Sequence, residues 1–209
     1  MITNGRLVMT GDSITDCGRR YPQDGTPDSR GWGYVSYVNA YVRAFRPELS
    51  LEILNTGISG NTTADLCARW QTDVLDLKPD YVTLMIGVND VWRKYDGNPQ
   101  AHVPADRYRE NLRHLIEQTI PHVREMYLLT PYFLEVDPED PMRKDVDAYA
   151  QIVQALSEQY RLPLVDIRKE FLARLETSPY TEWSLDRVHP NHVGHMVIAR
   201  QVLEKTGLR

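Results

Sequence analysis

The chain has few of the features that mark several classes of protein. Its 209 residues include only two cysteines, Cys17 and Cys67, which lie in no Cys-x-x-Cys pair and no Cys/His cluster. This excludes a disulfide framework and favours a reducing, cytoplasmic location. The most apolar segment, Tyr81 to Val88, is far short of the roughly 18 residues that span a bilayer. There is no repeat, low-complexity tract or Gly/Ser linker, so we expect one domain over residues 1–209.

An excess of positive charge is also missing. The sequence has 24 Lys and Arg residues against 29 Asp and Glu residues, which gives a net charge of −5. Proteins dedicated to nucleic acids or anionic membranes carry a basic surface, so we expect neither partner. Near the N-terminus only three consecutive residues, Leu7 to Met9, are apolar. A signal peptide needs a core of about 7–15 such residues, so nothing here predicts export.

Short apolar runs rich in β-forming residues recur along the whole chain. Their apolar character is nearly continuous and does not alternate, which is typical of parallel strands covered on both faces. Gly, Pro, Asn or Asp residues bound each run and punctuate the pattern. The predicted strands are Arg6 to Thr10, Leu51 to Asn55, Tyr81 to Ile86, Glu125 to Thr130 and Leu162 to Ile167.

The segments between these runs carry apolar residues at helical spacing. Examples surround Val38, Trp70, Leu112 and Val153. A last helix is expected from Pro190 to a stop near Gly207, and residues 131–141 are expected to form a loop. The alternation of strand and helix predicts a three-layer α/β/α sandwich with a central five-stranded parallel sheet of flavodoxin-like type.

Chemically active residues follow the predicted strands, where the sites of such sheets collect. GDSIT begins at Gly11, and DRVHP begins at Asp186 just before the last helix. A serine hydroxyl becomes a nucleophile when a base removes its proton, and the base needs a carboxylate to fix its tautomer. Ser13, His189 and Asp186 provide these three groups.

Donors for an oxyanion are available after two other strands. TGISGNTT begins at Thr56 and GVNDVW at Gly87. A glycine brings a backbone N–H close to a substrate without a Cβ in the way, and an Asn amide is a neutral donor. These properties indicate Gly60 and Asn89 as oxyanion donors.

The blocks GDSIT, ISGNT, GVND and DRVHP together resemble the four signature blocks of the SGNH hydrolases, also called GDSL-type esterases and lipases. They occur in the family's order from residue 11 to residue 190. Within the family, GDSITDCGR, GVNDVWRKYD and DPMR look closest to bacterial intracellular acetylxylan esterases. The resemblance implies an SGNH-hydrolase fold, no cofactor, a homo-oligomer and deacetylation of xylo-oligosaccharides. It assigns the nucleophile to Ser13, the catalytic dyad to Asp186 and His189, and the oxyanion donors to Ser13, Gly60 and Asn89.

Two other functions stay open. A short-chain lysophospholipase or an acyl thioesterase would use the same residues on another acyl group. A flavodoxin-like module would instead use GDSIT to bind the phosphate of a flavin or nucleotide at a helix start. This second hypothesis gives no role to Asn89, Asp186 or His189.

Several further residues are expected at or near the site. Trp92, Arg93 and Tyr95 follow Asn89 and should rim the cavity, and Arg143 should lie at its mouth. These four are the predicted substrate-binding residues. Asp12 and Asp90 are expected to accept hydrogen bonds from backbone N–H groups and so fix their loops.

The string of His189, His192 and His195 resembles a metal site only superficially. Spacings of three and six residues on a helix sweep away from one face, whereas common zinc ligands on a helix are four apart. We therefore expect no metal. Trp183 and Tyr180 are candidates for a contact between copies of the chain.

Overall fold

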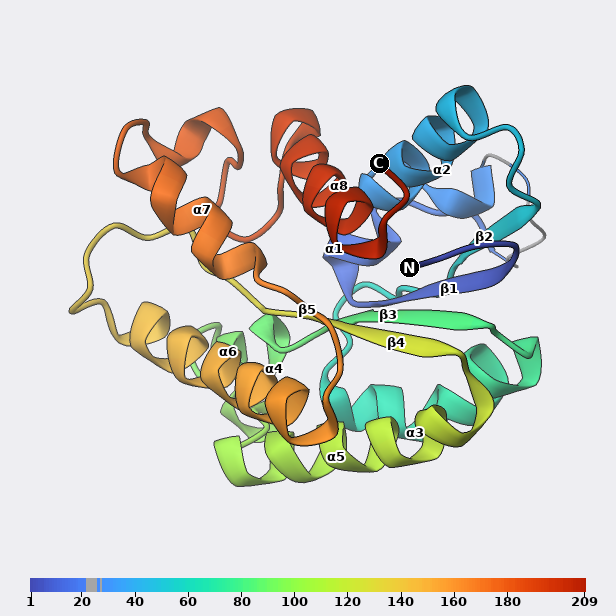
Figure 1. The fold of residues 1–209 in the computed structure, drawn as a ribbon. Coiled ribbons are helices and arrows are strands. Elements are labelled where there is room, and N and C mark those ends of the chain that lie inside the picture. Colours follow the sequence, from blue (N-terminus) through green and yellow to red (C-terminus); the bar gives the residue numbers. More distant parts are fainter. Residues whose placement is uncertain (22–25, 27) are drawn as a thin grey trace.

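The computed structural model describes residues 1–21, 26 and 28–209, and it has a five-stranded sheet at its centre (Figure 1). The strand order is β2-β1-β3-β4-β5, and all four neighbouring pairs run parallel. This order confirms the predicted flavodoxin-like sheet. The strands are β1 (Gly5–Gly11), β2 (Leu51–Asn55), β3 (Tyr81–Met85), β4 (Glu125–Leu129) and β5 (Leu164–Val165).

Helices cover both faces of the sheet and complete the predicted three layers (Figure 1). One face carries α1 (Ser13–Asp16), α2 (Tyr34–Phe45), α7 (Ile167–Leu175) and α8 (His192–Thr206); the other carries α3 (Thr63–Asp73), α4 (Val88–Trp92), α5 (Ala105–Thr119) and α6 (Pro141–Tyr160). Single 3-10 turns lie at Asp28–Arg30, Leu75–Leu77, Pro99–Ala101, Ile120–His122 and Tyr180–Glu182.

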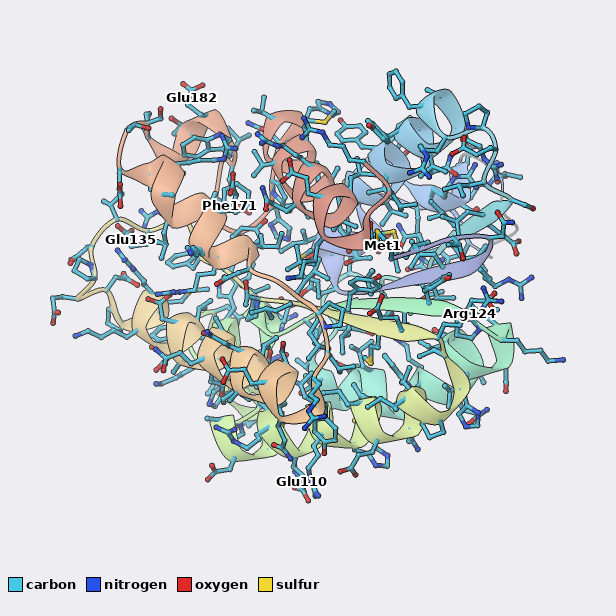
Figure 2. The ribbon with its side chains drawn as sticks, in the orientation of Figure 1. Met1, Glu110, Arg124, Glu135, Phe171 and Glu182 are labelled. Carbon is cyan, nitrogen blue, oxygen red and sulfur yellow. The ribbon has the colours of Figure 1, made fainter. Side chains whose placement is uncertain are left out.

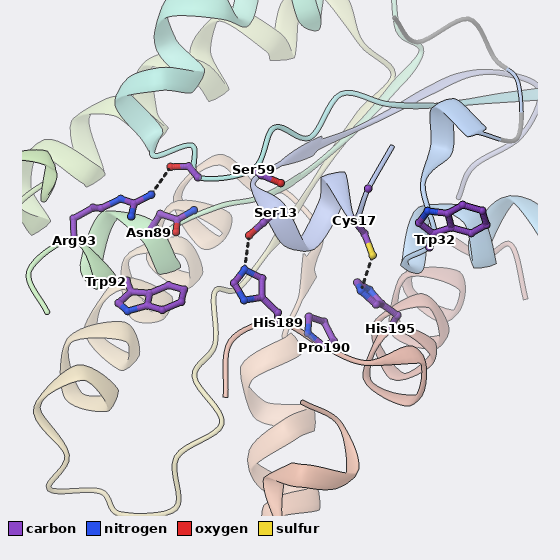
Figure 3. A pocket seen from close by; sticks show the side chains of 12 residues that line it. Ser13, Cys17, Trp32, Ser59, Asn89, Trp92, Arg93, His189, Pro190 and His195 are labelled. Atoms are coloured by element: carbon purple, nitrogen blue, oxygen red, sulfur yellow. Dashed lines mark hydrogen bonds between the residues drawn. The ribbon is translucent and has the colours of Figure 1, made fainter. Parts of the chain in front are cut away.

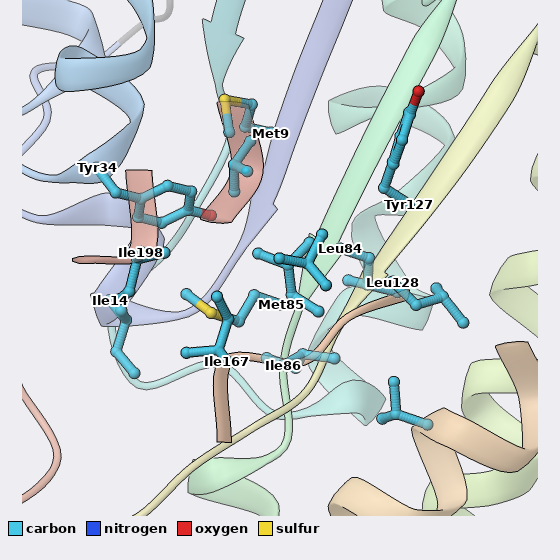
Figure 4. Packing of buried hydrophobic residues seen from close by; sticks show 14 of the residues in the cluster. Met9, Ile14, Tyr34, Leu84, Met85, Ile86, Tyr127, Leu128, Ile167 and Ile198 are labelled. Carbon is cyan, nitrogen blue, oxygen red and sulfur yellow. The ribbon is translucent and has the colours of Figure 1, made fainter. Parts of the chain in front are cut away.

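The core forms because the inner strands are apolar on both faces. Val8 and Val82 are fully buried, and they are register partners on β1 and β3. Figure 4 shows how side chains of β1, β3 and β4 meet those of the covering helices, such as Ile198 of α8. Charged side chains such as Glu110 and Arg124 point outward from the layers (Figure 2). None of the helices in the described ranges is long and apolar enough to cross a membrane.

Strand β5 and helix α8 differ most from the prediction, whereas the bounds of β1, β3 and β4 differ by one residue at one or both ends. Strand β5 has only two residues because Pro163 has no N–H for a ladder and the Asp166 side chain already caps α7 by accepting from the Lys169 N–H. Helix α8 begins at His192, since the side chain of Asn191 accepts from the N–H groups of Val193 and Gly194. Pro190 therefore stays in the preceding loop, which forms an isolated bridge with Ser184.

The C-terminal end of α8 and the loop before α6 agree with the prediction. Gly207, with φ of 72°, ends α8 in the left-handed conformation that favours glycine. Residues 130–140 form neither helix nor strand, and α6 begins at Pro141. The sequence pattern did not predict α1, α4 and α7, which are too short or too weakly amphipathic to show a period.

The strand order places a crevice beside the ends of β1 and β3. The chain steps from β1 outward to β2 and then back to β3 on the other side of β1. Loops that leave the sheet in opposite directions separate at such a switch point, and parallel sheets bind their ligands there. GDSIT and GVND follow these two strands, so the fold puts both at the crevice.

Candidate active site

Ser13, His189 and Asp186 form a continuous hydrogen-bonded chain, of which Figure 3 shows the bond between Ser13 and His189. Ser13 Oγ lies 2.9 Å from His189 Nε2, and His189 Nδ1 lies 2.6 Å from Asp186 Oδ2. A carboxylate only accepts, so Nδ1 carries the proton and the Nε2 lone pair faces the Ser13 hydroxyl. The structure thus brings together the three residues predicted for catalysis, in the order that proton transfer from serine requires.

Ser13 owes its position to the helix start at the end of β1. Asp12 caps α1, and its carboxylate accepts from the Ile14 N–H at 3.0 Å. Ser13 is the first helical residue, so its own N–H has no acceptor within the helix. Burial raises the pKa of Asp12 to about 7, against the lowering effects of the Ile14 N–H and of His189. Asp12 therefore fixes the loop, as the sequence predicted.

The loop that begins at Asp186 keeps the carboxyl group of this residue ionised. Its Oδ1 accepts from the N–H groups of Val188 and His189 at 3.0 and 2.7 Å. Partial burial raises the pKa of Asp186, but the hydrogen bonds from the His189 ring and from these two N–H groups outweigh it and lower the pKa. The Ser184 hydroxyl donates to the His189 carbonyl at 2.7 Å and holds the other side of the loop. A stable carboxylate can then orient and stabilise the imidazolium.

Gly60 and Asn89 line the same cavity as Ser13 and His189, with a volume of about 590 Å³. Gly60 has φ of 82°, a conformation that a side chain would strain. Asn89 is 3% exposed, and its amide nitrogen donates to the Asn61 carbonyl at 3.0 Å. An Asn amide has two N–H groups, so the second is free to serve the cavity.

The Arg69 side chain joins the loops around this cavity, a role that the sequence did not reveal. Its guanidinium donates to the carbonyls of Gly11 and Thr56 at 3.1 and 2.8 Å, and to the Asn61 side chain at 2.7 Å. Asp73, one turn later on α3, balances its charge at 2.9 Å. One side chain therefore fixes the ends of β1 and β2 and the loop that carries Gly60.

Asp16 makes a second connection from the nucleophile's own helix. Its Oδ2 accepts from the Ser59 N–H at 2.9 Å and from the Ser59 hydroxyl at 2.7 Å. Gly57 allows this approach, because a Cβ there would lie 2.4 Å from the Asp16 nitrogen. The predicted nucleophile and the Gly60 N–H thus belong to segments that are bonded to each other.

Two of the four predicted substrate-binding residues line the cavity. The Trp92 ring lies 5.8 Å from the His189 ring, centroid to centroid, and is tilted by 52°. Arg93 donates to the Gly60 carbonyl at 3.2 Å and pairs with Asp96 at 2.6 Å. Its charge is therefore already balanced beside the cavity.

The structure does not bring Tyr95 and Arg143 into the lining of this cavity. Tyr95 points to α6 instead, where its hydroxyl donates to Asp145 at 2.7 Å. Arg143 lies in the first turn of α6, bonds the Val136 carbonyl and lines a separate hollow with Leu172 and Leu175. Helix α6 starts at Pro141 and carries Arg143 away from Ser13, which corrects the expected place of this residue.

Other residues line the cavity without having been predicted. They include Cys17, Trp32, Ser59 and His195. Cys17 and Ser59 lie within GDSITDCGR and TGISGNTT, the blocks that the sequence placed at the site, but their own roles were not assigned. Trp32 stands in a segment without a clear period, which gave no signal.

The three histidines of the DRVHP region have separate partners. His192 contacts the Tyr37 hydroxyl at 2.8 Å, while His195 accepts from the Tyr34 N–H and contacts Cys17. Burial lowers the pKa of His195 to about 4, so this imidazole is neutral at pH 7. Across residues 1–21, 26 and 28–209, no three His, Cys, Asp or Glu side chains are grouped as metal ligands.

Comparison with known proteins agrees with this geometry. A model of the GDSL-like lipase/acylhydrolase family matches residues 9–197. The chain belongs to this family. It is therefore a carboxylic ester hydrolase, and the resemblance seen in the four sequence blocks is confirmed.

Several relatives of this acylhydrolase are similar over most of its length. An acetylxylan esterase of Geobacillus stearothermophilus is 43% identical over 97% of this chain and 94% of the relative. The crystal structure of that organism's acetylxylan esterase Axe2 has a TM-score of 0.96 at 42% identity, covering 99% of this chain and 96% of the other. LAE5, a hydrolase from a Lake Arreo metagenome, has a TM-score of 0.95 at 43% identity, with coverage of 99% and 97%.

Asn89→Ala tests the predicted role of Asn89 as an oxyanion donor. We expect kcat to fall by about 10²–10³ with little change in KM, because the donor acts mainly as charge develops in the transition state. Steady-state kinetics on an acetyl ester measures both constants. Asn111→Ala is the matched control, since this buried Asn donates to Thr63 at 3.1 Å and does not line the cavity. A rise in KM alone would make Asn89 a ground-state binding residue.

Asp90 is the second loop-fixing carboxylate. Its Oδ1 accepts from the Thr63 N–H at 2.9 Å and from the Thr63 hydroxyl at 2.5 Å, as the sequence predicted. Burial raises the pKa of Asp90 to about 7, although the bonds from Thr63 lower it and the charge of Asp12 raises it further. This carboxyl is fully buried and has no cation among the described residues that bond it.

Asp90→Asn should therefore change how stability depends on pH. The folded-state pKa lies above the unfolded value, so the protonated form stabilises the fold at low pH and that contribution is lost as pH rises through about 7. The loss of stability accumulates between about pH 4 and pH 7 and is on the order of 4 kcal/mol in all, of which roughly 3 kcal/mol falls between pH 5 and pH 8. Urea unfolding at pH 5 and pH 8 should show the variant gaining stability over wild type at the higher pH. An equal difference at both pH values would contradict this; exposed Asp76→Asn is the control.

Proposed function

We propose that this protein is a serine carbohydrate esterase that removes acetyl groups from acetylated xylo-oligosaccharides. The observation that supports it most is the hydrogen-bonded chain of Ser13, His189 and Asp186 beside Gly60 and Asn89. Ser13 Oγ attacks the acetyl carbonyl while His189 Nε2 takes its proton. The oxyanion is stabilised by the N–H groups of Ser13 and Gly60 and by the Asn89 amide.

The tetrahedral intermediate then breaks down to the acetyl-Ser13 ester. The bond to the sugar oxygen breaks, and His189 gives that oxygen the proton it took from Ser13. A water then attacks the acetyl-Ser13 ester with His189 again as base, which releases acetate and restores the serine. Asp186 stays ionised throughout and stabilises the imidazolium. The residues supply every proton transfer, so the mechanism uses no cofactor.

The choice of substrate is supported by the relatives and by the cavity. The acetylxylan esterase of Geobacillus stearothermophilus is similar over nearly the whole chain. The cavity beside Ser13 has two exposed or half-buried indoles and several polar side chains. The short-chain lysophospholipase or thioesterase alternative needs an apolar wall for its acyl chain, and the binding-module alternative leaves the convergence of Asn89, Asp186 and His189 on Ser13 unexplained.

We further propose that the enzyme works in the cytoplasm as a homo-oligomer. Exposed apolar side chains near the site support self-association: Leu185 is 85% exposed, and Val193 and Met196 on α8 are 55% and 54% exposed. Trp183, one of the two residues expected at such a contact, is instead 6% exposed and packs near Phe171. Light scattering that shows a monomer at micromolar concentration would contradict the oligomer.

The acyl group can be tested with a series of esters of one alcohol. An acetylesterase should lose kcat/KM as carbons are added, because they meet polar loop atoms or the fixed Trp92 ring. A lipase would gain up to ~0.8 kcal/mol for each methylene that it buries. We expect acetyl esters to react faster than butyryl esters and octanoyl esters to be nearly inert. Faster turnover of octanoyl than of acetyl esters would favour the lysophospholipase or thioesterase.

A further inference from the structure

The cavity has an indole ring toward each end, with Ser13 and His189 between them (Figure 3). Trp92 follows Asn89 on α4, and Trp32 lies just before α2. The two rings come from opposite faces of the sheet. The cavity therefore has two distinct halves on either side of the nucleophile.

The predicted oxyanion donors assign a direction to the substrate. Asn89 is on the Trp92 side, and Arg93 binds the Gly60 carbonyl there at 3.2 Å. The negative oxygen of the tetrahedral carbon must point to that half. The oxyanion donors and the Trp92 ring occupy that half, which leaves the Trp32 half open for the rest of the alcohol, while its leaving oxygen stays within reach of His189 Nε2 for the proton.

Trp32 is arranged as a surface that a ligand can cover. Its side chain is 66% exposed although it lines the cavity. Its backbone is fixed, because the Trp32 N–H donates to the Cys17 carbonyl at 2.9 Å at the end of α1. Gly18 lies beneath the indole, and a Cβ there would come within 3.1 Å of Trp32 Cδ1. The ring thus has a firm support on one side and a free surface toward solvent.

Among the described residues that line this half of the cavity, the polar side chains are uncharged: Cys17, Ser59 and His195. Burial lowers the pKa of His195 to about 4 and raises the pKa of the Cys17 thiol, so both are neutral at pH 7. The Ser59 hydroxyl donates to Asp16, and its oxygen can still accept a hydrogen bond. This half therefore suits a neutral group with hydroxyls and a flat apolar face. A pyranose ring has both, since its C–H groups form faces that pack on aromatic rings.

We propose that Trp32, with Gly18, Cys17 and Ser59, forms a sugar-binding subsite in which the indole packs against the ring of the leaving alcohol. The inference rests on the proposed carbohydrate esterase function and adds the residue that selects the sugar. The acetyl methyl group would then lie in the Trp92 half. Trp32 therefore contributes to binding of the leaving alcohol and takes no part in breaking the ester bond.

The test compares two acetyl esters whose alcohols differ in size. Acetylated xylobiose carries a sugar, and ethyl acetate carries a small alcohol without an aromatic ring that could itself pack on Trp32. For Trp32→Ala we expect kcat/KM to fall by about tenfold on acetylated xylobiose, mainly through KM, and by less than about twofold on ethyl acetate. Trp32→Phe should recover most of the loss. Activity on ethyl acetate also shows that the variant folds.

Phe45→Ala is the matched control, because Phe45 is a 67% exposed aromatic residue of α2 outside the cavity. Phe45→Ala should leave kcat/KM unchanged on both substrates. The subsite would be overturned if Trp32→Ala lowered kcat/KM equally on both esters, or did not lower it on acetylated xylobiose. Wild-type enzyme that does not prefer acetylated xylobiose to ethyl acetate would instead contradict the proposed function itself. The two failures are therefore distinguished by the wild type alone.

Discussion

The geometry of the site depends on the hydrogen bonds that the Arg69 guanidinium donates to the surrounding loops. The parallel strands β1, β2 and β3 end at the same edge of the sheet, but their pairing alone does not fix the directions of the loops that follow them. Arg69 bonds Gly11, Thr56 and Asn61, and so fixes the loop after β2 against the end of β1. Burial lowers the pKa of Arg69, while the hydrogen bond and charge of Asp73 raise it. Arg69 already restricts the directions of these loops. The hydrogen bonds of Asp16 and Asn89 then only have to complete the geometry of the site.

Three of the aspartates near Ser13 show how environment separates the pKa values of identical side chains. Asp186 is partly exposed and accepts from two N–H groups and an imidazole, so it stays ionised. Asp12 and Asp90 are buried without a cation among the described groups that bond them, and burial raises both pKa values to about 7. Asp186 is the one that bonds the His189 ring and has a lowered pKa, so it is placed to orient and stabilise the imidazolium. The other two hold the loops through backbone N–H groups and a hydroxyl.

Much of this could be predicted from the sequence, because it depends on local patterns. Nearly continuous apolar runs predicted the strands, and Gly207 predicted the end of the last helix. The carboxyl ends of parallel strands share one edge, so the polar blocks after them had to meet. Arg69 could not be recognised, since a basic residue on an amphipathic helix is usually exposed and nothing local shows that it turns inward. The same holds for Arg143 and Tyr95, whose directions depend on where α6 begins and packs.

The proposed mechanism requires the three predicted oxyanion donors to be in place before a substrate arrives. The most direct test is a crystal structure of the enzyme whose Ser13 has reacted with a serine-directed phosphonate. We expect a phosphonyl oxygen about 2.7–3.1 Å from the N–H nitrogens of Ser13 and Gly60 and from Asn89 Nδ2, with the loops that carry Gly60 and Asn89 unchanged in position. An adduct on another serine would contradict it, as would an oxygen that points away from these donors.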